Sequence, residues 1–69
     1  MIVLQAMRLN APANRFQYRI EASSGELYLL SDPVAAAAKL EELGVSSPGR
    51  LVAHVRTWGV VHIVPDRGL

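Results

Sequence analysis

"RFQYRIEASSGELYLLSDPVAAAAKLEELGV" occupies residues 15–45, and within it the hydrophobic pattern changes from one typical of strands to one typical of a helix. Residues 15–22 alternate strictly, so that Phe, Tyr, Ile and Ala lie on one face and Arg, Gln, Arg and Glu on the other. The segment "ELYLL" (26–30) follows a Ser-Ser-Gly turn. We therefore expect strands at 15–22 and 26–30 to pair as a β-hairpin.

The length of the hairpin loop decides which side chains of the second strand share the polar face. A loop of two or four residues would place Tyr28 and Leu30 beside the arginines of the first strand. A loop of three residues would place Leu27 and Leu29 there instead, because a shift by one residue exchanges the two faces of a strand. The sequence leaves both arrangements open.

Residues 31–45 carry the start and stop signals of a helix. Asp32 is suited to capping the first turn, and Pro33 fits the first helical position, where its missing N–H costs nothing. Gly44 fits the left-handed position after the last turn, and Val45 can make the closing apolar contact. Between these signals, one stripe of small and aliphatic side chains is expected to pack on the sheet: Ala36, Ala37, Leu40 and Leu43.

The segments on either side complete the predicted sheet. Residues 2–9 form an apolar run, which predicts a strand buried on both faces. Turn clusters are expected at 10–14, 22–26 and 46–50. The stretch "LVAHVRTWGVVHIV" (51–64) predicts a second hairpin closed by Thr57-Trp58-Gly59, with His54 directly opposite His62.

Together these elements predict an α+β fold in the order β-β-β-α-β-β. It is an antiparallel sheet of four to five strands with one helix packed on one face, and residues 1–69 form a single domain. Hydrophobic residues make up 51% of this short chain. A chain of this size has little interior, so part of its apolar surface is expected to contact a partner or a second copy of the chain.

The composition argues against several classes of function. Seven Lys or Arg against six Asp or Glu leave a net charge of +1, too balanced for nonspecific polyanion binding. The chain has no cysteine, and its N-terminus resembles neither a signal peptide nor a membrane span. We find no nucleophile with a base and no phosphate-binding loop, so neither enzyme activity nor a cofactor is predicted. Two histidines are too few ligands for a zinc site, so no metal is predicted either.

The outward face of the predicted sheet is the expected partner-binding surface. It would gather these residues: Arg15, Gln17, Arg19, Tyr28, His54, Arg56, Trp58 and His62. Arginine mixed with aromatic or leucine side chains is typical of protein-binding hot spots. The same face could bind nucleic acid, with arginines on phosphates and Tyr28 stacked on a base. A merely solvated sheet face is the third interpretation.

At "SDPVAAAAK" (31–39), with the alternating strand before it and the final "IVPD" after it, the chain resembles small phage-encoded anti-CRISPR proteins that inhibit type I-F systems. The resemblance covers residues 15–66, although the link before the helix and the helix itself are shorter here. It implies an inhibitor that binds a Cas surveillance complex or another bacterial host protein in the host cytoplasm and blocks it without chemistry. A nucleic-acid-binding module and a homodimeric phage accessory protein are the alternatives.

Overall fold

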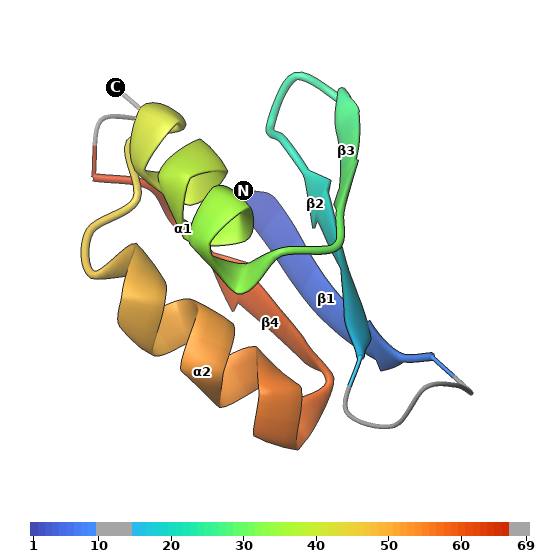
Figure 1. The fold of residues 1–69 in the computed structure, drawn as a ribbon. Coiled ribbons are helices and arrows are strands. Elements are labelled where there is room, and N and C mark those ends of the chain that lie inside the picture. Colours follow the sequence, from blue (N-terminus) through green and yellow to red (C-terminus); the bar gives the residue numbers. More distant parts are fainter. Residues whose placement is uncertain (10–14, 67–69) are drawn as a thin grey trace.

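The structure, a computed structural model, describes residues 1–9 and 15–66. Its elements, in chain order, are β1 (Ile2–Arg8), β2 (Phe16–Glu21), β3 (Leu27–Leu30), α1 (Pro33–Glu42), α2 (Pro48–Trp58) and β4 (Val60–Ile63). The four strands form one antiparallel sheet in the order β3-β2-β1-β4, and both helices lie on the same face of it (Figure 1). The predicted α+β class is confirmed, whereas the predicted element order and the single helix are not.

The β2–β3 hairpin has the three-residue loop. The N–H of Ala22 donates to the carbonyl of Glu26 at 2.8 Å, and the N–H of Gly25 donates to the carbonyl of Ala22 at 2.9 Å. Gly25 has a φ of 96°, the left-handed conformation that closes such a loop. Tyr28 consequently pairs with buried Ile20 and lies on the helix side of the sheet. Its assignment to the outward partner surface is therefore wrong.

Helix α1 begins and ends as the sequence predicts. The carboxylate of Asp32 accepts a hydrogen bond from the N–H of Val34 at 3.2 Å. At the other end, the N–H of Val45 donates to the carbonyl of Leu40 at 3.0 Å, and the N–H of Gly44 donates to the carbonyl of Glu41 at 3.0 Å. This is the Schellman arrangement, which needs the left-handed Gly44.

The predicted hairpin over 51–64 is wrong, because Pro48–Trp58 is a helix and only Val60–Ile63 is a strand. Pro48 occupies the first turn of α2, and Gly59, with a φ of 89°, donates its N–H to the carbonyl of Val55 at 2.7 Å. The apparent alternation arose because β-branched residues are frequent in strands. Here Val52 and Val55 lie on one face of a helix, and their packing against the sheet overrides the preference of valine for strands.

Strand β1 occupies a central position in the sheet, between β2 and β4. Ile2 and Leu4 point toward the helices and are buried, whereas Met7 on the other face is 42% exposed. The expectation that residues 2–9 are buried on both faces is therefore wrong, since the helices cover one face only. The turn predicted at 10–14 lies outside the described residues.

The core fills the layer between the sheet and the two helices. Its buried members are Ile2, Leu4, Tyr18, Ile20, Ala36, Leu40, Val45, Val52, Val55 and Ile63. Helix α1 packs on β2 and β3, whereas α2 packs on β1 and β4. Among the described residues, no helix has the length and apolar character needed to cross a membrane.

Candidate functional site

The structure divides the expected partner-binding residues between two sides of the molecule. Gln17, Arg19 and His62 lie on the sheet face away from the helices, because they alternate along the strands with side chains that are buried beneath the helices: Tyr18, Ile20 and Ile63. His54, Arg56 and Trp58 belong to α2, on the opposite side of the sheet. The single basic surface expected from the sequence is therefore wrong, because it rested on the hairpin that turned out to be α2.

The uncovered side, which we call the open sheet face, follows from the strand register. Residues paired across strands share a face, and two rows cross all four strands. One row is Leu29, Arg19, Gln5 and Val60, and the other is Leu27, Glu21, Val3 and His62. Gln17 pairs with Met7 beyond the first row.

The open sheet face exposes large apolar side chains. Leu29 is 56% exposed, Leu27 is 49%, Val60 is 47% and Met7 is 42%. The two leucines stand at one edge of the sheet, beside Arg19 and Glu21 on the neighbouring strand. Charges of opposite sign amid exposed aliphatic groups resemble the mixed composition of a protein interface. The signal for the leucines was the Ser-Ser-Gly loop, whose length fixes which side of β3 faces outward.

The two histidines are not cross-strand neighbours. His54 stacks with Trp58, one helical turn further along α2, with ring centroids 6.0 Å apart. His62 lies on β4 opposite Val3. Within residues 1–9 and 15–66, no group of three or more His, Cys, Asp or Glu side chains is placed to hold a metal ion.

Tyr28 makes its polar contacts on the helix side of the sheet. Its hydroxyl donates to Glu26 Oε2 at 3.1 Å, and this hydrogen bond, together with burial and the charge of Glu26, raises the pKa of Tyr28 above 10.0. Lys39 of α1 places Nζ 4.5 Å from the centre of the Tyr28 ring and pairs with Glu42 at 3.2 Å. Tyr28 thus joins β3 to α1.

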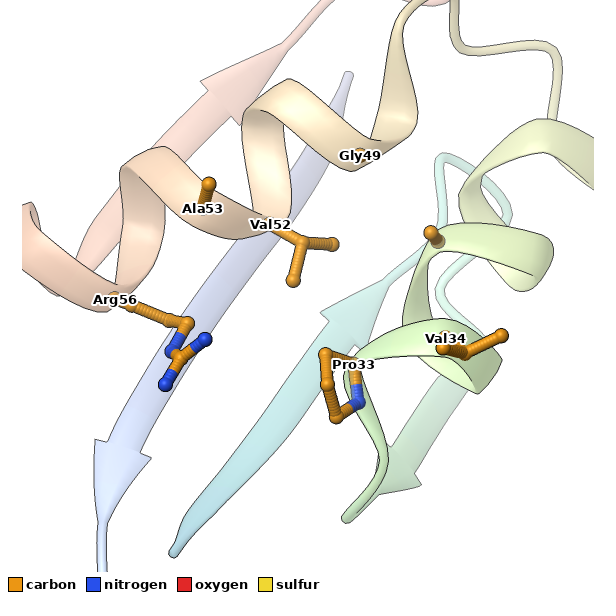
Figure 2. Close-up of a pocket in the computed structure, with 7 residues that line it drawn as sticks. Pro33, Val34, Gly49, Val52, Ala53 and Arg56 are labelled. Carbon is orange, nitrogen blue, oxygen red and sulfur yellow. The ribbon is translucent and has the colours of Figure 1, made fainter. Parts of the chain in front are cut away.

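A shallow groove of about 320 Å³ runs between the two helices. Figure 2 shows Val52 and Arg56 projecting from α2 on the side that faces Pro33 of α1. The groove is lined by Pro33, Val34, Ala37, Gly49, Val52, Ala53 and Arg56. Arg56 is its one charged side chain, and all the others are apolar or glycine.

Arg56 also belongs to a small cationic cluster at one end of the sheet. Its guanidinium carbon lies 5.0 Å from the centre of the Phe16 ring, and that of Arg8 lies 5.7 Å from the same centre. Arg15 is exposed, directly before β2, and lines a separate small hollow with Leu9, Phe16 and Ser31. The roles of Arg8 and Phe16 could not be predicted from the sequence, because residues 51–58 were expected to form a strand and nothing placed these two residues near Arg56.

Comparisons with protein-family models, with curated proteins and with solved structures found no match to this chain.

Proposed function

We propose that this protein is a non-catalytic inhibitor that binds a bacterial protein stoichiometrically, most specifically an anti-CRISPR directed at a Cas surveillance complex in the cytoplasm of the host. The observation that carries the proposal is the open sheet face, where Leu27 and Leu29 stand exposed beside Arg19. The resemblance of residues 15–66 to inhibitors of type I-F systems supplies the target class.

Energetics favour a protein partner for this face. Covering a leucine that is already half-buried contributes about 1 kcal/mol, roughly half the value for burying the whole side chain. Leu27, Leu29, Val60 and Met7 together therefore offer several kcal/mol. Arg19 adds a planar cation that can pair with a carboxylate of the partner. Exposed aliphatic side chains next to an arginine are a usual composition of an interface hot spot.

The charge distribution argues against nucleic acid as the partner of the same face. Within the paired rows of this face, Arg19 and Glu21 are the two charged residues, and they have opposite signs. Arg15, exposed directly before β2, is the next cation toward the N-terminus. Nucleic-acid binding draws most of its affinity from several cations that displace counterions from phosphates. Two arginines beside a glutamate do not supply that affinity.

The test is copurification with a purified, assembled type I-F surveillance complex. We expect the protein to bind at a fixed ratio and to reduce target-DNA binding by the complex. Leu29→Glu should weaken binding at least tenfold, because it places an unpaired carboxylate in the apolar part of the contact. Ala38→Glu is the matched control, since it adds the same charge at an exposed position of α1.

Two further measurements separate the alternatives. Binding to the protein complex should fall gently between 50 and 200 mM salt, whereas nucleic-acid binding falls by orders of magnitude. Sedimentation equilibrium should give the mass of one chain; a dimer that Leu29→Glu dissociates would support the homodimeric accessory protein instead. Failure to copurify, or equal loss in the Leu29→Glu and Ala38→Glu proteins, would refute the proposed target or the proposed face.

A further inference from the structure

We infer that the groove between α1 and α2, with the two arginines at Phe16, is a second binding site that takes an acidic, leucine-rich peptide segment of a partner protein. This site lies on the helix side of the molecule and goes beyond the function proposed for the open sheet face. Three features point to it: two cations that have no carboxylate partner among the described residues, an adjoining apolar groove, and the absence of an aromatic side chain from the residues that line the groove.

The first feature is a pair of like charges held at one aromatic ring. Arg8 from β1 and Arg56 from α2 each place a guanidinium group within 6 Å of Phe16 on β2. Among the described residues the one ion pair is Lys39–Glu42, so neither guanidinium group has a carboxylate within 4.0 Å. Two neighbouring cations without a counterion attract an anion, and guanidinium groups bind carboxylates through paired hydrogen bonds.

The sheet supports this cation pair. Phe16 is half-buried, and its ring centre lies 6.4 Å from that of Tyr18, which is only 1% exposed. The ring is therefore anchored to the core, and each guanidinium group rests on a fixed surface. Less side-chain entropy is lost on binding when the cation is already positioned in this way.

The second feature is the apolar groove that adjoins Arg56. Its lining includes Pro33, Ala37 and Val52, and Gly49 and Ala53 contribute little side-chain volume on the α2 side. Figure 2 shows Val52 projecting toward α1. Val34 at its margin is 73% exposed. Aliphatic side chains of a peptide would bury apolar area in this groove, while an acidic side chain next to them reaches Arg56 and Arg8.

The third feature distinguishes a peptide from a nucleic acid. The ring of Phe16 is half-buried, and the guanidinium carbons of Arg8 and Arg56 lie 5.7 and 5.0 Å from its centre, so a base stacked on it would compete with these cations. Trp58 is the exposed aromatic side chain of α2, but it follows Arg56 by two positions and so points about 200° away around the helix. Phosphates bound at the arginines would therefore leave their bases without a stacking partner.

The probes are synthetic decapeptides, acetylated and amidated, that combine leucine and glutamate in different orders and carry a fluorophore. We expect a subset to bind the full-length protein in an anisotropy titration. Replacing glutamate by glutamine, or leucine by alanine, should each weaken that subset at least tenfold, since both the charge and the apolar contact are used.

Protein variants locate the site. Arg56→Gln and Arg8→Gln should each weaken the peptide about tenfold or more, the usual effect of removing a hydrogen bond to a charged group. Arg50→Gln is the matched control, because Arg50 is an exposed arginine of the same helix that does not line the groove; its effect should stay below twofold. Ala53→Phe fills the groove and should block binding, while an unchanged circular dichroism spectrum shows that the variant folds.

Three results would overturn the inference. The first is that no glutamate peptide binds better than its glutamine counterpart. In the second, the alanine-substituted peptides bind as well as their parents, so that only an anion site is present. The third is that a twelve-nucleotide single strand binds more tightly than any peptide and that this binding is lost in the Arg56→Gln protein. None of these assays contains a Cas complex, so failure here and failure of the proposed inhibition are distinguishable.

Discussion

The two helices of this protein lie side by side on one face of the sheet, and similar residue types mark their ends. Only α1, however, could be recognised from the sequence. Both begin with proline in the first turn and end before a glycine whose φ is close to 90°. Helix α1 has ten residues and α2 has eleven. The same end residues therefore predict a helix reliably only when the residues between them also favour a helix.

The difference lies in how much of each helix is specified locally. Helix α1 contains four consecutive alanines, the strongest helix formers, and its first turn is capped by the side chain of Asp32. Helix α2 contains two buried valines, and its N-cap Ser47 has a φ of 52° and makes no side-chain hydrogen bond to the first turn. Helix α2 therefore depends more on packing against the sheet than α1 does.

The largest expected effect is on α1. Leu40 is fully buried among α1, α2 and the sheet, so Leu40→Ala should lower the free energy of unfolding by about 2–5 kcal/mol. Urea denaturation followed by circular dichroism measures this loss. A chain of this size has a small stability margin, and the variant should be partly unfolded at 37 °C. An unchanged midpoint would contradict the packing of α1 described above.

The corresponding substitution in α2 should have a smaller effect. Val55 is also fully buried, and Val55→Ala removes less apolar volume, so the loss should be about 1.5–3 kcal/mol. Because alanine is a better helix former than valine, its higher helix propensity offsets this loss by a few tenths of a kcal/mol. Trp58 at the end of α2 is the only tryptophan, so its fluorescence reports this helix directly. A more stable Val55→Ala protein would show that the low helix propensity of valine, and not the packing of Val55, limits the stability of α2.

Much of the fold could be predicted because the relevant signals are local. The alternation at 15–22 fixes a strand, the Ser-Ser-Gly turn fixes a hairpin, and the signals around Asp32 and Gly44 fix α1. Each of these depends on side chains within a few residues of one another. The structure reproduces all three, and with them the α+β class.

The candidate site could not be predicted, because its placement depends on contacts between distant segments. Residues 51–58 satisfy a strand pattern and a helix pattern equally, since Leu51 and Val55 are spaced for both. Only the packing of Val52 and Val55 against the sheet selects the helix. That choice moves His54, Arg56 and Trp58 to the helix side of the sheet. The overlooked signal was Pro48 at the start of the segment together with Gly59 at its end. Pro33 and Gly44 are the corresponding pair that identified α1.

The N-caps of the two helices should differ in how much they stabilise the protein. Asp32→Ala removes a side-chain cap from α1 and should cost about 1 kcal/mol. Ser47→Ala removes no such hydrogen bond from α2 and should change the free energy of unfolding by less than about 0.5 kcal/mol. Ser47→Gly relieves a left-handed serine and should stabilise the protein slightly. Thermal unfolding of the three variants tests this order, and equal losses in the two alanine variants would mean that both residues cap alike.

The smallest expected effect concerns the cation that each helix places over an aromatic ring of the sheet. Arg56 of α2 lies over Phe16, which cannot ionise, but Lys39 of α1 lies over Tyr28, whose ionisation reports the contact. The hydrogen bond to Glu26 raises the pKa of Tyr28, whereas the positive charge of Lys39 lowers it. Glu26→Gln should therefore lower this pKa toward 10.0, and Lys39→Gln should raise it further.

Absorbance at 295 nm measures the titration, and Tyr28→Phe identifies which of the two tyrosines is responsible. Because the folded protein holds the Tyr28 proton more tightly than the unfolded chain, the associated stability is present below about pH 10 and is lost as the pH rises through the raised pKa. A Lys39→Gln protein with a lower Tyr28 pKa would contradict the placement of Lys39 over the ring. It would also leave α2 as the one helix that holds a cation against the sheet.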